Sequence, residues 1–280
     1  VKDIKKGSRT RKAPIPFTTS TLQQEASKAL NFSTQKTMRI AQQLYEGVDI
    51  KGRGTIGLIT YLRTDSTRVS ETAEVQVKEF IESKYGDSYM AKEINSKKSN
   101  KKIQDAHEAI RPTDVNLMPE EVKDQLPRDL FRLYQLIWRR FVASRMENSV
   151  YETTNVKVNA GKYIFNASTS KLDFDGFMKV YTDSDNEKVV TNNTIAKLEK
   201  DSKLEFEKFE ENQHFTQPPA HFTEAALVKA MEEQGIGRPS TYSPIISTLL
   251  KRRYITKEAK NIFVTELGEV VNSIMKESFP

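Results

Sequence analysis

The stretch VYETTNVKVNA, residues 150–160, marks a change in the periodicity of the chain. Before it, apolar residues recur every three or four positions, as in helices that bury one face. Within it, and again in KYIFNAS, GFMKVYT and SKLEFEKFE, apolar and polar residues alternate, as in the strands of an antiparallel sheet. The pattern predicts an α+β protein with a sheet domain over residues 150–210.

The segments before this sheet predict an inserted helical unit. Residues 1–4 also alternate, and if they pair into the same sheet, the helical segment lies inside the sheet domain. That segment begins as a helix-turn-helix: Ser20 and Gln23 have capping-box spacing, and Ser33 can cap a second helix that ends at Gly47. A strand is expected over residues 56–61, directly after these helices.

The helical period returns after the sheet. Thr223 and Ser240 each stand where they can cap a helix, and residues 255–264 alternate as a small wing hairpin. The unit therefore resembles a winged helix-turn-helix, a pattern that favours DNA but has many false positives. The remaining helices are expected from Ser70 to Gly86, after Pro127, and around residues 270–275.

The expected strand before Ser66 ends in polar groups, in GLITYLRTDS, residues 57–66. Because side chains alternate along a strand, Tyr61 and Arg63 would share one side. A phenol titrates near ~10 and is a poor nucleophile unless a cation stabilises the phenolate. Arg63 supplies that charge and can grip two phosphate oxygens, so the pair predicts phosphoryl transfer to Tyr61. A plainer alternative has Tyr61 packed at a strand end and Arg63 paired with Asp65.

Two further stretches carry groups that suit a phosphate. His107 and Arg111, in DAHEAIRPT, would face the same way if the segment were a helix. Arg238, in GIGRPSTY, lies in a glycine-lined turn before a helix, where backbone N–H groups and the hydroxyls of Ser240 and Thr241 suit an anion. Taken singly, each has a structural alternative: His107 could be a structural histidine whose hydrogen bonds are satisfied within the protein, and Arg238 a surface residue of a turn.

In their order along the chain, ITYLRTDS, DAHEAIRPT and PPAHFTEAALVKAMEEQGIGRPSTYSPIISTL resemble the type IA DNA topoisomerases, and among them bacterial topoisomerase I. The resemblance extends from Ile15 to the end. It implies that Tyr61 cuts one DNA strand and holds its 5′ end, that Arg63 positions the scissile phosphate, and that His107 belongs to the same centre. It also implies strand binding, to which we assign Asp65, Ser66, Arg111, Arg238, Ser240 and Thr241.

The resemblance implies partners and a cofactor as well. Single-stranded and negatively supercoiled DNA would be the substrate, religation would need no ATP, and a monomer in the bacterial cytoplasm, at the nucleoid, is expected. Family members bind Mg²⁺ through a Toprim domain that precedes the region seen here, so we expect no metal ligands in this chain and little activity from it alone. Asp183, Asp185 and Glu187 have the family's acidic spacing, but they lie in a predicted polar turn.

The family fold implies a gated torus with four parts. These are an N-terminal strand and linker (1–20), a helical domain that carries the tyrosine (21–146), a β hinge domain (147–215) and a segment that holds the single strand (216–280). The hinge would open to separate Tyr61 from the last segment and admit the second strand.

Composition is compatible with this interpretation and excludes some others. In 280 residues, Lys and Arg number 44 against 38 Asp and Glu, so a net charge of +6 permits a polyanionic partner. The absence of cysteine excludes disulfides and cysteine-ligated metals, and no apolar run reaches the ~20 residues of a membrane span. Two alternatives stay open: a sequence-reading helix-turn-helix regulator without chemistry, and a tyrosine recombinase, although its tyrosine would lie near the C-terminus.

Overall fold

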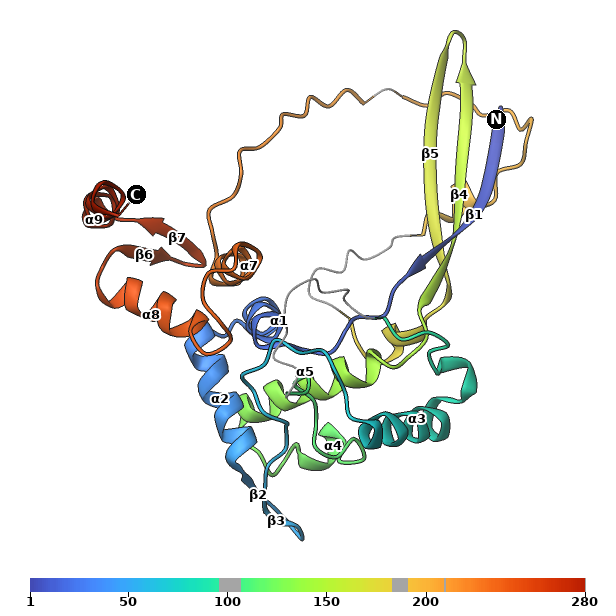
Figure 1. The fold of residues 1–280 in the computed structure, drawn as a ribbon. Coiled ribbons are helices and arrows are strands. Elements are labelled where there is room, and N and C mark those ends of the chain that lie inside the picture. The colour runs from blue at the N-terminus through green and yellow to red at the C-terminus, as the bar shows by residue number, and fades with distance from the viewer. Residues whose placement is uncertain (96–106, 183–190, 209, 280) are drawn as a thin grey trace.

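The computed structural model describes residues 1–95, 107–182, 191–208 and 210–279. A helical body lies between a long sheet on one side and a smaller helical unit on the other (Figure 1). No helix in these ranges is long and apolar enough to cross a membrane. The strands of the long sheet are β1 (Asp3–Arg11), β4 (Ser149–Ala160) and β5 (Tyr163–Phe174).

The sheet has the order β1-β4-β5 and is antiparallel throughout. Asp3 pairs with Lys157 and Arg11 with Ser149, which confirms that the N-terminal segment joins the sheet. In the sequence, residues 12–148 therefore separate β1 from β4, two strands that are neighbours in the sheet. The α+β class is confirmed, whereas the four domain boundaries stay predictions.

Two of the expected strands are wrong. GFMKVYT forms a short 3-10 helix, η3 (Gly176–Lys179), which buries Phe177 against the helical core instead of the sheet. Gly176 permits this turn because its φ is +49° and a Cβ there would lie 2.5 Å from the carbonyl oxygen of Glu147. SKLEFEKFE has no strand in its described residues: Leu204 and Phe206 are exposed, so no second layer covers its apolar side.

The helical body has one core, in which Phe17, Tyr134 and Phe141 are fully buried. Tyr134 donates to the carbonyl oxygen of Leu117 at 2.6 Å, and the Trp138 indole donates to that of Val115 at 2.9 Å, so both rings are core residues with satisfied polar groups. The elements of this body are α1 (Thr19–Glu25), η1 (Ala26–Leu30), α2 (Thr34–Glu46), β2 (Val48–Ile50), β3 (Gly54–Ile56), α3 (Glu71–Tyr85), η2 (Asp87–Tyr89), α4 (Pro119–Val122) and α5 (Arg128–Ala143).

Most helix boundaries follow their predicted caps. The Ser33 hydroxyl accepts from the N–H of Lys36, and α2 ends at Gly47 as expected. The first capping box is formed by Thr18 and Thr21 instead of Ser20 and Gln23. The expected pair lies inside α1, where both residues are buried.

The structure around the tyrosine differs from the sequence patterns at two places. The strand expected over residues 56–61 ends at Ile56, because the N–H of Leu58 bonds to the end of α2 and Ile59 forms only an isolated bridge. Residues 107–112 are extended, not helical, because Ile110 and Pro112 bridge to Phe17 and Ile59. A proline at 112 also disfavours helical geometry at Arg111.

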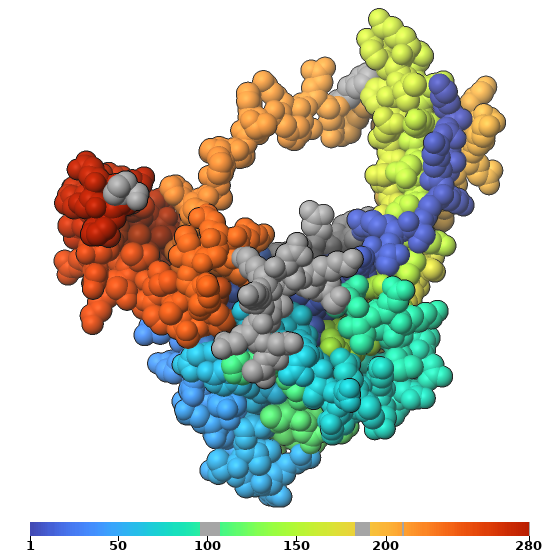
Figure 2. All heavy atoms as spheres, viewed as in Figure 1, coloured from blue at the N-terminus to red at the C-terminus, as the bar shows by residue number. Residues whose placement is uncertain are grey.

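The last unit begins as predicted, with the Thr223 hydroxyl accepting from the N–H of Ala226, and contains the expected wing hairpin. The second of its helices begins one residue later than predicted, with Thr241 in the cap position instead of Ser240. Figure 2 shows an open space between the long sheet, the helical body and the extended chain that leads to this unit. The remaining elements are α6 (Asn193–Ala196), α7 (Glu224–Gln234), α8 (Tyr242–Lys251), β6 (Ile255–Glu258), β7 (Asn261–Val264) and α9 (Glu266–Ser278).

Candidate active site

Tyr61 lies in the irregular segment after β3, between residues from two other parts of the helical body. Its ring centroid is 5.0 Å from that of His107 and 5.6 Å from that of Tyr45, which meets it edge-on from the end of α2. Tyr61 and His107 are half-buried. The phenol thus lies at the surface with an imidazole beside it.

Arg63 is exposed, two residues along the chain, while Leu62 between them is fully buried. The Arg63 guanidinium donates to the Gln42 side chain on α2 at 3.3 Å. Within the described part of the chain it forms no ion pair with Asp65, so the plainer alternative of a surface Arg–Asp pair does not hold. A cation held by one neutral partner at the surface remains available to a phosphate.

The Arg111 guanidinium has its own set of partners among the described residues, which do not include His107. Its guanidinium forms an ion pair with Glu108 at 2.7 Å and donates to the carbonyl oxygen of Pro112 at 3.0 Å and to the Ser70 hydroxyl at 3.3 Å. The Arg111 guanidinium, which we expected to suit a phosphate, therefore already has protein partners. Its contact with DNA stays a prediction.

Asp65 and Ser66, which we expected to bind DNA, have different environments. Asp65 is exposed, whereas Ser66 is buried and its hydroxyl accepts from the N–H of Arg68 at 3.1 Å. DNA binding by Ser66 also stays a prediction, and its hydroxyl already accepts a hydrogen bond within the protein.

The turn before α8 has the compact geometry that its glycines suggest. The Thr241 hydroxyl accepts from the N–H of Arg238 at 2.8 Å, and the Arg238 guanidinium donates to the carbonyl oxygen of Gly237 at 2.7 Å. Gly237 has φ +77°, a conformation that favours glycine. Arg238, Ser240 and Thr241 are all exposed, so this edge of the turn is accessible to a ligand.

Tyr242, the first residue of α8, follows this turn and is buried. Burial raises the pKa of the Tyr242 phenol, the Glu232 carboxylate raises it further, Arg238 opposes them, and Asp65 adds a smaller increase. Asp65 and Arg238 thus act on the same phenol from two units of the chain. In addition, α8 packs against α2, the helix that carries Gln42 and Tyr45.

Sequence reasoning missed Gln42 and Tyr45. Tyr45 is 39% exposed, although it recurs at the helical spacing of the buried residues of α2. The signal that could have found both is their spacing, because residues three apart share a helix face. That face borders Tyr61 and Arg63.

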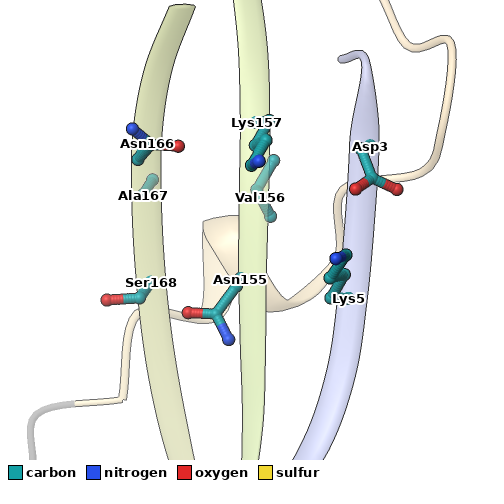
Figure 3. Close-up of a pocket in the computed structure, with 8 residues that line it drawn as sticks. All are labelled: Asp3, Lys5, Asn155, Val156, Lys157, Asn166, Ala167 and Ser168. Carbon is teal, nitrogen blue, oxygen red and sulfur yellow. The ribbon is translucent and has the colours of Figure 1, made fainter.

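The described residues contain no group of three or more His, Cys, Asp or Glu side chains that could hold a metal ion. The triplet Asp183, Asp185 and Glu187 lies outside the described residues. A pocket lies on the long sheet, lined by Asp3, Lys5 and Lys157 among others (Figure 3). It contains no residue of the Tyr61 site, and no chemical step is assigned to it.

Comparison with known proteins identifies the family. The family model described as DNA topoisomerase matches residues 1–280. The solved structure of full-length topoisomerase I from Thermotoga maritima is 40% identical, with a TM-score of 0.80, over 99% of this chain and 44% of that one. The chain thus spans less than half of the length of that enzyme. By this match over its whole length and this identity, the chain belongs to the DNA topoisomerase family, as a type IA topoisomerase similar to bacterial topoisomerase I.

Proposed function

We propose that this chain forms the strand-cleaving and gate portion of an enzyme that breaks and rejoins one DNA strand through a tyrosyl ester. The observation that carries the proposal is the grouping around Tyr61, whose ring lies 5.0 Å from that of His107 while Arg63 remains exposed two residues away. A nucleophile, a titratable neighbour and a fixed cation are the groups that phosphoryl transfer to tyrosine requires.

The proposed step breaks one phosphorus–oxygen bond for the one that it forms. The Tyr61 oxygen attacks the phosphorus, the bond from phosphorus to the 3′ oxygen breaks, and the phenolic proton leaves as the 3′ hydroxyl gains one. Arg63 offsets the charge that builds on the phosphate oxygens, and His107 orients the phosphate or the phenol. Religation reverses the step, so no ATP is consumed.

The other assignments extend this proposal to the substrate. Single-stranded DNA would lie across the Tyr61 site and the exposed turn of Arg238, and passage of the second strand would relax negative supercoils. As the family resemblance implies, Mg²⁺ would be held by a Toprim portion. We propose that this chain alone, without such a portion, is nearly inactive.

The test is adduct formation by a complemented mixture, which we define as this chain with an N-terminal Toprim fragment of a bacterial topoisomerase I, Mg²⁺ and labelled single-stranded DNA. A covalent adduct that withstands denaturation is expected from the mixture and not from either part alone. A helix-turn-helix regulator would instead bind duplex DNA with strong sequence preference and form no adduct. No adduct together with such binding would refute the proposal.

A further inference from the structure

Thr19, the first residue of α1, is fully buried and contacts the segment that carries Arg63. Its hydroxyl donates to the carbonyl oxygen of Leu62 at 2.7 Å and accepts from the N–H of Thr64 at 2.9 Å. These two groups belong to the peptide units on either side of Arg63. One side chain thus bonds to both groups, although Leu62 and Thr64 lie 43 and 45 positions further along the sequence.

The backbone of Thr19 strengthens the same contact. Its N–H donates to the carbonyl oxygen of Thr64 at 2.9 Å, so the start of α1 and residues 62–64 are joined by main-chain and side-chain bonds. Leu62 and Thr64 are themselves buried, at 0% and 1% exposure. Buried hydrogen bonds of this kind fix a backbone because their loss leaves polar groups without partners.

The other side of Tyr61 is held independently. The Thr60 hydroxyl donates to the carbonyl oxygen of Ala109 at 2.7 Å and accepts from the N–H of Arg111 at 3.0 Å. Thr60 therefore ties Tyr61 to the segment that carries His107, which leaves the backbone at Arg63 to be set by Thr19.

We propose that Thr19 is a positioning residue: its buried hydroxyl sets the backbone of Arg63, and through it the guanidinium, relative to the Tyr61 hydroxyl. The inference rests on the proposed function of Tyr61 and Arg63. Misplacement of a reacting group by about 1 Å can cost on the order of 10²-fold in rate. Loss of the hydroxyl should therefore slow cleavage far more than it weakens DNA binding.

The chain offers a matched control on the same helix. The Thr21 hydroxyl accepts from the N–H of Thr18 at 2.9 Å and closes the capping box of α1. Thr21→Val removes a threonine hydroxyl from α1 without touching residues 62–64. Thr19→Val removes the hydroxyl that bonds to residues 62–64 but keeps nearly the same side-chain volume. Thr19→Ser keeps a hydroxyl at this position.

The experiment has two readouts. Hydrogen exchange of residues 62–64 in this chain should be accelerated about 10-fold or more by Thr19→Val and hardly changed by Thr19→Ser or Thr21→Val. Single-turnover cleavage by the complemented mixture should fall about 10²-fold for Thr19→Val, with the dissociation constant for single-stranded DNA within about 2-fold and the two control variants within about 3-fold of wild type. Thr19→Ala gives the same comparison if the valine variant does not fold.

Two results would overturn the proposal: a wild-type cleavage rate for Thr19→Val despite faster exchange, or an equal loss for Thr19→Ser or Thr21→Val. Failure of the proposed function would look different. In that case the wild-type complemented mixture would form no adduct, or the adduct would persist in Tyr61→Phe, whatever Thr19→Val does.

Discussion

At the scale of single residues, the chemistry depends on which groups stand beside the Tyr61 hydroxyl and remain available to DNA. Arg63 is an available cation two residues from Tyr61, since it is exposed and contacts only the neutral Gln42 side chain among the partners described. Arg111, in contrast, is held by Glu108. The first prediction follows from the availability of Arg63.

Arg63→Ala should abolish most cleavage with little loss of DNA affinity. A charge that acts mainly in the transition state supplies rate more than binding, so we expect a loss on the order of 10²- to 10³-fold in the single-turnover rate. Arg53→Ala is the matched control, because Arg53 forms an exposed ion pair with Asp114 at 2.8 Å. Equal losses of rate and affinity in Arg63→Ala would argue against a role in the transition state.

Arg238→Ala should weaken strand binding uniformly across sequences. If its guanidinium contacts one phosphate, the slope of log K against log salt for a single strand should flatten by about 0.7. Titration of a labelled oligonucleotide at several salt concentrations measures this slope. A slope equal to that of wild type would mean that Arg238 does not contact the backbone of the strand.

How much of the site could be predicted differs between residues. Tyr61 and Arg63 are close in sequence, but we expected them to share one side because of strand alternation, and the strand ends at Ile56. Their joint role stays a prediction. The place of His107 depends on the bonds between Thr60 and the segment of Ala109 and Arg111, which join positions about 50 residues apart. No local pattern encodes such a pairing, and the helical geometry under which His107 and Arg111 would face the same way does not occur there.

At the scale of elements, helices with side-chain caps and glycine ends were predictable, whereas strands were predictable only where a neighbour pairs with them. The α2 helix has both signals, in Ser33 and Gly47. The segment SKLEFEKFE alternates as well as β4 does, but it lacks a partner strand in the described residues. Alternation indicates a capacity for pairing, and tertiary structure decides whether pairing occurs.

Gly57→Ala tests the packing of the Tyr61 segment against α2. A Cβ at Gly57 would lie 2.6 Å from the carbonyl oxygen of Tyr45, and the next N–H, of Leu58, bonds to Leu44 at 2.7 Å. Overpacking against backbone should cost about 1–3 kcal/mol in the free energy of unfolding and should also slow cleavage. Urea unfolding measures the first effect; an unchanged midpoint would show that the two segments can separate without cost.

At the scale of the whole molecule, a buried carboxylate joins the helical body to the last unit. Glu224 on α7 accepts from the N–H and hydroxyl of Thr34 at 2.8 and 3.0 Å, and Lys257 on β6 donates to it at 2.7 Å. Burial alone would raise the pKa of Glu224, but Lys257 and the donors of Thr34 outweigh it and lower the pKa. If the gate opens between these units, this contact must break.

Glu224→Gln should loosen the two units. Loss of a charged hydrogen bond should cost about 1–3 kcal/mol in the free energy of unfolding near neutral pH. Because the pKa is lowered in the folded state, this stabilisation is complete above the free value of about 4.3 and is lost as the pH falls through the lowered value. The difference between variant and wild type should therefore shrink in acid.

The control for this variant lies on the same helix. Glu233 forms an exposed pair with Lys229 at 3.9 Å, so Glu233→Gln should change the unfolding free energy by less than about 0.5 kcal/mol. Urea unfolding of both variants near neutral pH and in acid measures the effect. A cost for Glu224→Gln that stays constant into acid would contradict the role of its charge.

The central claim is that Tyr61 is the residue that becomes bonded to DNA, and mapping the trapped adduct tests it most directly. Tyr45 is a stringent control, since its ring is 5.6 Å from that of Tyr61. Peptide mass spectrometry of the adduct from the complemented mixture should find the nucleotide on Tyr61, in wild type and in Tyr45→Phe, and Tyr61→Phe should yield none. A nucleotide on Tyr45 or elsewhere, or an adduct that persists in Tyr61→Phe, would contradict the account.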